Sequence, residues 1–398
     1  MCTLNVPLIR QNAVDLITED ELVEKAKDGR PLRIKLGADP TSPDLHLGHA
    51  VVLEKMREFQ DMGHHVIFVI GDFTAMIGDP SGRNKVRKPM TLEEVRVNSQ
   101  TYVQQVSKIL DVAKAEIRYN SEWLSKISMA ELIKMMSQFT LSQILERDDF
   151  TKRFTGQIPI FMHEFLYPIM QGYDSVAIQA DLEMGGTDQK FNFLLARELQ
   201  IYFGQKPQAI LTMPLLVGTD GEAKMSKSLK NYIGITEKPD DMFGKAMSIP
   251  DSLILDYFRL ALHYSQEDLK SISYELTVTN PMQYKMKLAK EITRKYHSLE
   301  ESDHALSQFI AVHRNKEIPD DVPAYIVKQL SPVRLADFIT EAGLSPSKTE
   351  AKRIILQGGV EVNGEKWSDP FSHLTLTEGM VIKVGKRQYI KIQTRNES

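Results

Sequence analysis

Residues 37–49 constrain this chain more than any other stretch. Their sequence is GADPTSPDLHLGH, with an apolar run before it and helical periodicity from Leu45 onward. This pattern predicts a strand, a proline-rich turn and the start of a helix. His46 and His49 then share one face of the first helical turn, where unpaired N–H groups suit an anion, above all a phosphate. By themselves, the two histidines fit surface positions or helix caps equally well.

A second strand follows closely. Residues 66–70 form a continuous apolar run before Gly71, as expected for a strand buried on both faces of a parallel sheet. Strand, helix and strand within about forty residues make a βαβ unit, which crosses over right-handed. Further strands are predicted at 182–184 and 209–213. We therefore expect a doubly wound, Rossmann-like α/β domain that binds ligands at the carboxyl ends of its strands.

Composition restricts the class of protein. The chain has 398 residues, of which 42% are hydrophobic and 26% charged, so two or three domains are expected. Its one cysteine, Cys2, excludes an intrachain disulfide framework and fits a reducing compartment. No apolar run is long enough to span a bilayer, and we expect a cytoplasmic protein. The net charge of -4 argues against a uniformly basic nucleic-acid binder but leaves local basic patches possible.

Three further motifs lie far apart in the sequence. Residues 78–82 form a glycine-bounded loop after the second strand, and a basic cluster with Arg83 and Arg87 follows it. Taken alone, such a cluster is more often a solvated loop than a binding site. Residues 185–189, GGTDQ, follow another predicted strand. Residues 217–228 are too polar and glycine-rich for a core element, so we expect a mobile surface loop there.

The order of these motifs resembles that of class I aminoacyl-tRNA synthetases. HLGH at 46–49 and KMSKS at 224–228 correspond to the family's two signatures, HIGH and KMSKS, and the second has no mismatch. YPIMQGYD at 167–174, together with a small C-terminal unit, points within the class to bacterial tyrosyl-tRNA synthetases. The resemblance covers nearly the whole chain. It implies a tyrosine–tRNA ligase, which makes tyrosyl-adenylate from tyrosine and ATP and then passes the tyrosyl group to the 3′ end of tRNA(Tyr).

The resemblance also implies roles around ATP. His46 and His49 match the catalytic positions at the phosphates, and Lys224 and Lys227 match those on a loop that closes over the developing pyrophosphate. The implied ATP-binding residues are Gly37, Asp39, Gly48, Arg83, Arg87, Asp188, Lys227 and Ser228. We expect Mg²⁺ to bridge phosphate oxygens, and no cluster of carboxylates in the sequence indicates a dedicated metal site.

A tyrosine site is implied in the same way. The matching positions are Asp79, Tyr167 and Gln171 for the ammonium group, Gln189 for the carboxylate and Asp188 for the ribose. Tyr167, Gln171 and Asp174 lie on one helical face. We expect Asp174 to read the substrate hydroxyl, because an ionised carboxylate only accepts and so demands a donor. Lys35 stands where much of the family has a tyrosine that shares this hydroxyl, and it could pair with Asp174 or point away.

Three domains are expected: a Rossmann-like catalytic domain at 1–232 with a helical insertion at about 90–160, an α-helical anticodon-side domain at 233–325, and a small α+β RNA-binding domain at 331–398. The last resembles an RNA-binding module of a ribosomal small-subunit protein. Its basic residues are Lys348, Lys352, Arg353, Lys386 and Arg387. Such charges suit an RNA backbone, although by charge alone they could form a solvated face. The resemblance further implies a homodimer through residues 129–153.

Other functions compete with this interpretation. Tryptophanyl-tRNA synthetases share the core signatures, but Asp174 and the C-terminal module disfavour them. A nucleotidylyltransferase shares the His-x-Gly-His helix start but would not need the KMSKS loop. A catalytically inactive, synthetase-like RNA-binding protein has no physical need for both histidines and both loop lysines. Amino-acid-dependent exchange of pyrophosphate into ATP separates all four.

Overall fold

The protein is described here from a computed structural model that covers residues 4–40, 44–79, 92–314, 322–327, 331–385 and 388–394. The chain divides into two compact units, Met1–Ser298 and Leu299–Ser398. The first unit contains the predicted α/β sheet and the helices that follow it, and the second contains the small C-terminal sheet. The finer division into three domains stays a prediction.

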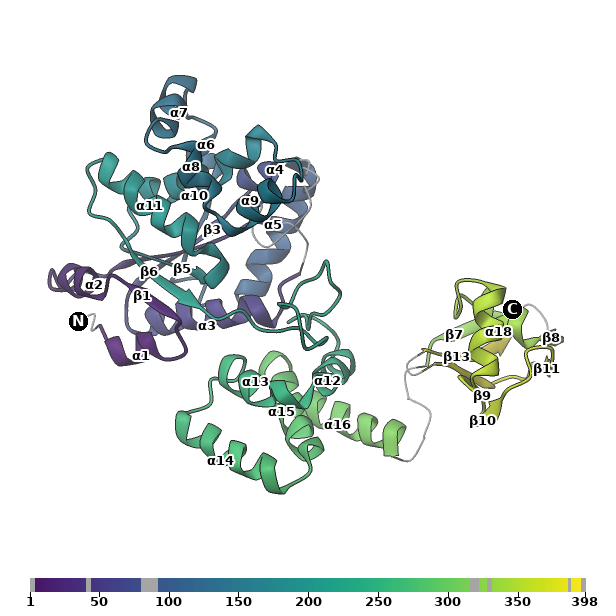
Figure 1. The fold of residues 1–398 in the computed structure, drawn as a ribbon. Helices are drawn as coiled ribbons and strands as arrows, with labels where there is room; N and C mark the ends of the chain where they lie inside the picture. The colour runs from purple at the N-terminus through teal and green to yellow at the C-terminus, as the bar shows by residue number, and fades with distance from the viewer. Residues whose placement is uncertain are drawn as a thin grey trace. The chain divides into compact units, whose positions relative to one another are not determined.

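The first unit is built on a sheet that has six strands among the described residues, in the order β1-β6-β5-β2-β3-β4. Only β1 runs antiparallel to its neighbour among these strands. The strands are β1 (Asp15–Ile17), β2 (Arg33–Ala38), β3 (His65–Ile70), β4 (Glu116–Tyr119), β5 (Leu182–Gly186) and β6 (Ala209–Met213) (Figure 1). The predicted doubly wound parallel sheet is confirmed. The sequence places β4 inside the helical insertion, whereas in the structure it pairs with β3 at the edge of the sheet.

The chain reverses its direction of winding between β2 and β5. β3 and β4 lie on one side of β2, and β5 and β6 lie on the other. In open α/β sheets, ligands bind outside the carboxyl ends of the strands at this switch point. β2 ends at Ala38 and β5 ends at Gly186, so the turns that follow these two neighbouring strands emerge side by side.

Helices surround this sheet. The bounds are α1 (Val6–Arg10), α2 (Glu19–Ala26), α3 (Leu47–Asp61), α4 (Thr74–Ile77), α5 (Leu92–Val106), α6 (Ser121–Leu124), α7 (Met129–Met136), α8 (Leu141–Leu145), α9 (Asp148–Thr155), α10 (Leu166–Ala177) and α11 (Lys190–Tyr202), with short 3₁₀ turns at Met162–Phe165 and Thr187–Gln189. α10 and α11 pack closely because Gly172 has no side chain: a Cβ there would lie 2.8 Å from Leu199. Within the described residues, no helix is both long and apolar enough to cross a membrane.

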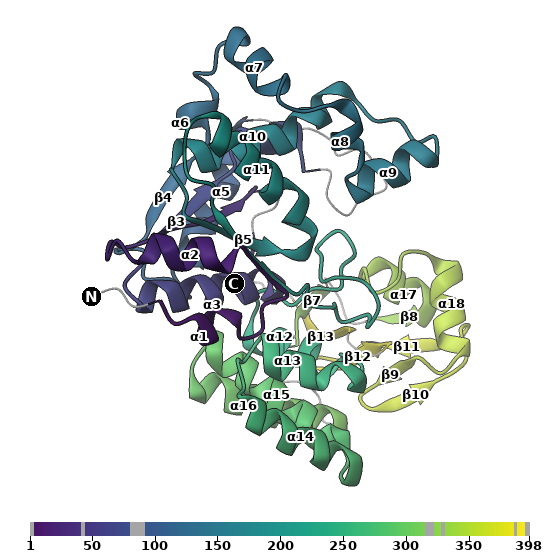
Figure 2. The same ribbon diagram turned by 60° about the vertical axis from the view of Figure 1, so that its left-hand side comes forward.

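Four more helices complete the first unit. They are α12 (Pro239–Met247), α13 (Ile254–Leu260), α14 (Gln266–Val278) and α15 (Pro281–Tyr296), with a 3₁₀ turn at Asp251–Leu253. Both ribbon views show these helices and α7 at opposite ends of the first unit (Figures 1 and 2). The helical pattern predicted from residue 238 onward is confirmed.

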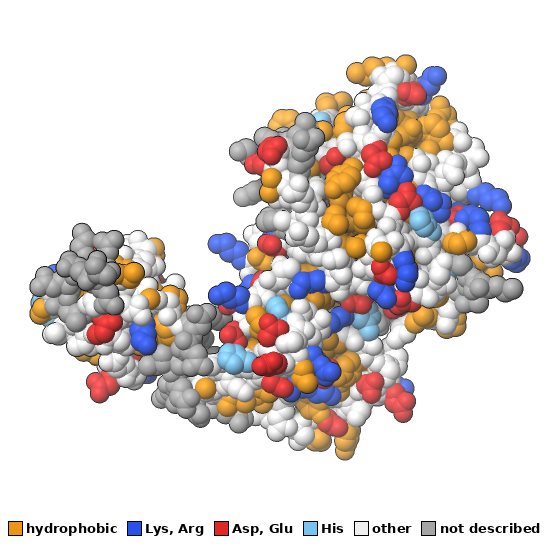
Figure 3. Space-filling model, turned by 180° about the vertical axis from the view of Figure 1, so that it is seen from behind, with side chains coloured by type: hydrophobic (Ala, Val, Ile, Leu, Met, Phe, Trp, Pro, Cys, Tyr) orange, Lys and Arg blue, Asp and Glu red, His pale blue; other side chains and the backbone are white. Residues whose placement is uncertain are grey.

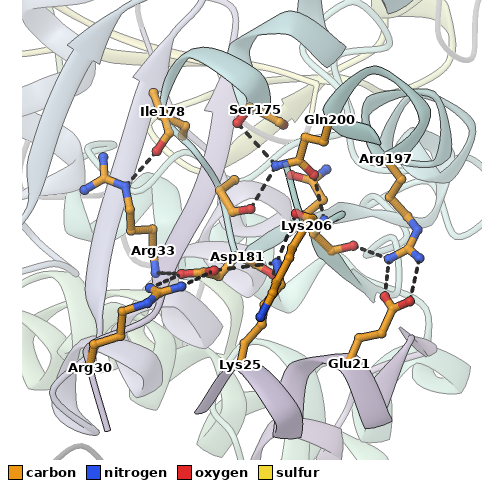
Figure 4. A network of polar contacts seen from close by, with 12 residues as sticks. Glu21, Lys25, Arg30, Arg33, Ser175, Ile178, Asp181, Arg197, Gln200 and Lys206 are labelled. Carbon is orange, nitrogen blue, oxygen red and sulfur yellow. Dashed lines mark hydrogen bonds and ion pairs between the residues drawn. The ribbon is translucent and has the colours of Figure 1, made fainter. Parts of the chain in front are cut away.

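Charged side chains close a network at the amino ends of β2 and β5. Figure 4 shows Lys25, Arg30 and Arg33 gathered around Asp181. The Arg30 guanidinium donates to both oxygens of Asp181 at 2.6 and 2.7 Å, and the Arg33 backbone N–H donates at 2.9 Å. The Lys25 ammonium lies 3.5 Å from the same carboxylate. Burial alone would raise the pKa of Asp181, but these donors hold it below its ordinary value.

The second unit has α16 (Leu299–Arg314), α17 (Leu335–Glu341) and α18 (Lys348–Leu356). Its described strands form a sheet of order β10-β9-β12-β13-β7 and the pair β11-β8. The bounds are β7 (Ala324–Val327), β8 (Pro332–Arg334), β9 (Val360–Val362), β10 (Glu365–Trp367), β11 (His373–Thr375), β12 (Val381–Val384) and β13 (Gln388–Thr394). Ile339, Ile355 and Ile382 belong to one buried cluster, so both shorter helices pack on the sheet.

Candidate active site

The two histidines lie at the start of α3, as the sequence predicts. His46 is the N-cap residue, with extended backbone angles, and its backbone N–H donates to Nδ1 of His49 at 3.3 Å. The two imidazole rings are 3.8 Å apart between centroids. Gly48 allows this approach, because a Cβ at that position would lie 3.1 Å from the His46 ring.

Both imidazoles lie in a place that disfavours the charged form. Burial, and then the charges of His49, Lys227 and Lys224, hold the pKa of His46 far below its ordinary value. Burial and the same two lysines lower the pKa of His49 to about 4. The rings are therefore neutral at pH 7. Each neutral imidazole can donate one N–H hydrogen bond to a ligand.

The predicted loop at 217–228 folds back on itself around one asparagine. The Asn231 side chain accepts from the Ser226 N–H at 2.7 Å and donates to Asp220 at 2.8 Å. Gly218 lies against it so closely that a Cβ would be 2.3 Å from the Asn231 side chain. In this conformation the loop is shaped by its own hydrogen bonds.

The two loop lysines reach different turns at this edge of the sheet: Lys227 contacts the turn before α3, and Lys224 contacts the turn after β5. The Lys227 ammonium donates to the backbone carbonyl of Asp44, and the Lys224 ammonium pairs with Asp188 at 2.7 Å. Burial lowers the pKa of Lys227 to about 8. Met225, between the two lysines, is buried, and its Cβ would lie 3.7 Å from a Cβ at Gly48. The structure thus brings together the motifs at 46–49, 185–189 and 224–228, which lie far apart in the sequence.

Asp174 lies on α10 and is held by two neutral donors. Nε1 of Trp123 donates to it at 2.8 Å and Nδ2 of Asn120 at 3.2 Å. Burial raises the pKa of Asp174 to about 6, while the positive charge of Lys35 and the two hydrogen bonds limit the rise. The carboxylate is mostly ionised at pH 7 and has oxygen lone pairs suited to a further donor.

Tyr167 connects the residues expected to bind tyrosine with those expected to bind ATP. Its hydroxyl donates to Asp39 at 3.0 Å, and the other oxygen of Asp39 accepts from Thr74 at 2.7 Å. Burial and the nearby carboxylates of Asp39 and Asp79 raise the pKa of Tyr167, so its hydroxyl stays protonated. Asp39, expected near ATP, therefore also orients a residue expected near tyrosine.

The remaining polar residues form one continuous network. Asp79 accepts from Arg147 at 3.0 Å and from Gln189 at 3.1 Å. Asn192 donates to Gln171 at 2.6 Å and to Gln189 at 3.1 Å, and it accepts from Arg147 at 3.1 Å. The structure thus brings Asp79, Gln171 and Gln189 together, as a cooperating site requires.

Comparisons with known proteins decide the family. Residues 27–314 match the model described as "tRNA synthetases class I (W and Y)", and residues 314–392 match the tyrosine–tRNA ligase SYY-like C-terminal domain. This chain belongs to the class I tyrosyl-tRNA synthetases. The predicted family and enzyme class are confirmed.

Curated relatives agree along the whole length. The tyrosine–tRNA ligase of Carboxydothermus hydrogenoformans is 51% identical and matches 97% of this chain and 96% of its own. That of Thermotoga maritima is 49% identical, with 97% and 96% covered. Among solved structures, the tyrosyl-tRNA synthetase of Archaeoglobus fulgidus complexed with L-tyrosine gives a TM-score of 0.62 at 25% identity, covering 76% of this chain and 98% of that one.

Four residues that contact the predicted site residues carry no prediction from the sequence. Asn120 and Trp123 follow the carboxyl end of β4, where an α/β sheet places its ligands, but the sequence pattern predicts this strand inside the helical insertion. Asn192 lies three residues after Gln189 on the same helical side, a spacing that could have identified it. Arg147 lies between α8 and α9 and carries no motif.

Lys35 has a definite partner. Its ammonium lies 2.8 Å from Glu183 on the neighbouring strand β5, so it pairs with neither Asp174 nor solvent.

Two other predicted positions also lie among the described residues. Gly37 lies in β2, and a Cβ at this position would lie 4.0 Å from Cε of Lys35. Ser228 lies at the end of the loop at 217–228, with its hydroxyl oxygen 2.9 Å from that of Ser226.

The other predicted positions divide into two groups. Arg83, Arg87, Lys386 and Arg387 lie outside the described residues. In the second unit, Lys348 pairs with Asp337 at 2.9 Å and Arg353 pairs with Glu350 at 2.6 Å. The Lys352 ammonium lies 5.2 Å from the centre of the exposed Phe371 ring. An RNA role for these residues stays a prediction.

Proposed function

We propose that this synthetase activates tyrosine with ATP and transfers the tyrosyl group to the 3′ end of tRNA(Tyr), using the residues gathered at the carboxyl ends of β2 and β5. The observation that carries this proposal is the convergence of two neutral imidazoles and two lysines on the edge of the sheet that also carries the polar network of Asp79, Gln171 and Gln189. The polar network and Asp174 suit tyrosine, and the histidines and lysines suit the phosphates of ATP.

The activation step needs no covalent partner from the enzyme. The tyrosine carboxylate attacks the α-phosphorus of ATP and pyrophosphate leaves, so catalysis rests on positioning and on stabilising charge that grows in the transition state. Neutral His46 and His49 would donate N–H bonds to the phosphate oxygens at the N-terminus of α3. Lys224 and Lys227 would neutralise the leaving pyrophosphate from the loop above.

Nucleotide binding changes the partner of Lys224 in this scheme. Asp188 is the proposed ribose contact and also accepts from Lys224 at 2.7 Å. A ribose hydroxyl that donates to Asp188 competes with this ion pair and frees the ammonium for phosphate. We assign the rest of the nucleotide site to Gly37, Asp39, Gly48, Arg83, Arg87 and Ser228. Mg²⁺ would arrive with ATP as part of the substrate and would offset the negative charge of the phosphates.

Tyrosine would lie between α10 and the ends of the strands. Its hydroxyl would donate to Asp174, which two neutral donors already orient. Its ammonium group would face Asp79, Tyr167 and Gln171, and its carboxylate would lie on the side of Gln189. A related solved structure was determined with L-tyrosine bound, which supports a tyrosine pocket in this fold.

Partner surfaces complete the proposal. Figure 3 shows apolar side chains gathered at the top of the molecule, over α7. Met129 is 71% exposed, and Ile133 and Leu141 are each 60% exposed, which supports a homodimer through residues 129–153.

The basic residues of α18 support tRNA binding by the C-terminal unit. We place the enzyme in the cytoplasm, where tRNA charging takes place.

Exchange of radiolabelled pyrophosphate into ATP tests this function directly. The purified protein is assayed with each of the twenty amino acids in turn. We expect exchange with tyrosine alone, because Asp174 favours a substrate that brings a hydroxyl donor. Exchange with tryptophan alone, or with no amino acid, would contradict the proposal.

A further inference from the structure

Lys35 is an unusual residue for the middle of a sheet. Its ammonium group belongs to a side chain with 0% exposure, in β2 and in contact with the turn of α10 proposed to bind tyrosine. Burying an ammonium is costly unless every hydrogen finds a partner. The contacts of Lys35 therefore indicate what the residue is for.

Three acceptors surround the ammonium. It lies 2.8 Å from Oε1 of Glu183 and donates to Oγ of Ser175 at 2.8 Å and to the backbone carbonyl of Gln171 at 3.0 Å. In the parallel pairing of β2 with β5, Lys35 stands opposite Glu183, so the two side chains share one face of the sheet. Two hydrogen bonds and one ion pair thus commit the Lys35 ammonium to protein groups rather than to substrate.

Two of the acceptors lie on one turn of α10. Gln171 and Ser175 are four residues apart, and the side chains proposed to face the substrate, Gln171 and Asp174, belong to the same turn. The Ser175 hydroxyl also donates to Glu183 at 3.0 Å. The pair Lys35 and Glu183 thus fastens this turn to the centre of the sheet.

The charge of Lys35 acts on the same turn. Burial raises the pKa of Asp174 to about 6, and Lys35 on β2 opposes the rise, whereas Glu183 on β5 adds to it. Trp123 and Asn120 bind Asp174 as neutral donors. Without Lys35, more of Asp174 would be protonated near neutral pH. A protonated carboxyl can donate as well as accept, so it selects less strictly for a substrate hydroxyl.

We propose that Lys35 is a positioning residue for tyrosine selection: it fixes the α10 turn and keeps a positive charge behind Asp174, so that this one carboxylate reads the substrate hydroxyl. The inference rests on the proposed function. It assigns to Lys35 a contribution to specificity without any contact to the substrate.

The variant Lys35→Met tests the inference by pyrophosphate exchange. We expect the KM for tyrosine to rise about tenfold and the KM for ATP to change less than about twofold, because the substitution disturbs the α10 turn and not the loop lysines. The preference for tyrosine over phenylalanine in kcat/KM should fall about tenfold. The acid limb of kcat/KM for tyrosine should move to higher pH.

Two further variants guard against misfolding. Lys35→Met together with Glu183→Gln leaves no unpaired charge in the sheet, so it should be more stable than Lys35→Met. It should keep the part of the loss of preference that comes from the unfastened α10 turn, whereas the shift of the acid limb should shrink, because Glu183, which raises the pKa of Asp174, is also removed. Lys35→Arg keeps the positive charge and should recover part of the preference. The matched control is Lys25→Met, which removes a buried ammonium beside Asp181 at the other end of the sheet and should leave the preference unchanged.

The outcomes separate clearly. A folded Lys35→Met or double variant with the native KM for tyrosine and the native preference overturns the inference. An equal loss of preference in Lys25→Met also overturns it, because the effect would then follow from any buried lysine. If the native protein shows no tyrosine-dependent exchange, the proposed function fails as well.

Discussion

Two buried aspartates near the same pair of strands differ in what surrounds them. The carboxylate of Asp181, before β5, accepts from a guanidinium and a backbone N–H and forms an ion pair with an ammonium group, and its pKa lies below the ordinary value despite burial. Asp174 accepts from an indole and an amide, both neutral, and burial raises its pKa to about 6. The protein thus neutralises the carboxylate that only holds the fold together. The buried negative charge of Asp174 is only partly compensated, as expected for a group that receives a ligand.

The largest expected effect comes from lysines at the ligand end of the sheet. Lys224→Met combined with Lys227→Met should lower the kcat of activation by about a thousandfold, because both charges that stabilise the leaving pyrophosphate are removed. The KM for tyrosine should change little. Lys25→Met, at the amino end, should lower stability and leave kcat near its native value. Pyrophosphate exchange and thermal unfolding of both variants measure the contrast, and a kcat loss in Lys25→Met would break the comparison.

A smaller effect is expected where one neutral donor is removed. Trp123→Phe keeps the ring but deletes the N–H that donates to Asp174 at 2.8 Å. The KM for tyrosine should rise about tenfold to a hundredfold, which corresponds to the loss of one hydrogen bond to a charged group. Kinetics with tyrosine and phenylalanine measure it. If both amino acids lose the same factor, Trp123 supports the pocket without helping to read the hydroxyl.

Much of this organisation is predictable from the sequence. The strand at Ala209–Met213 has the bounds that its apolar run predicts, and His46 and His49 lie on one helical turn as their spacing requires. Local patterns carry this information because strands and helices have fixed periods. The family motifs then identify the groups that converge on the ligand.

Cross-strand partners are harder to predict. Lys35 pairs with Glu183 only because β2 and β5 are neighbours in a particular register. The same is true of Asn120 and Trp123, which reach Asp174 only because β4 joins the sheet beside β3. Strand order and register join residues that lie far apart in the chain, and hydrophobic periodicity does not encode them.

The contributions of Asp181 and Asp174 to the free energy of unfolding depend on pH with opposite signs. The pKa of Asp181 in the folded protein lies below 3.8, so its contribution to stability is complete above that pH and is lost as the pH falls through the folded-state pKa. The pKa of Asp174 rises from 3.8 to about 6, so its cost to stability appears as the pH rises through that interval and is complete above it. That cost is at most about 3 kcal/mol.

One paired measurement tests the account most directly: Asp174→Asn and Asp181→Asn, compared at pH 7.5 by denaturant unfolding and by kcat/KM for tyrosine and phenylalanine. We predict that Asp174→Asn loses most of its preference for tyrosine while its free energy of unfolding is no lower than native. Asp181→Asn should keep the preference and lose about 2 kcal/mol of stability, because Arg30 and Lys25 lose their charged partner. An unchanged preference in Asp174→Asn, or a lost preference in a folded Asp181→Asn, would contradict the account.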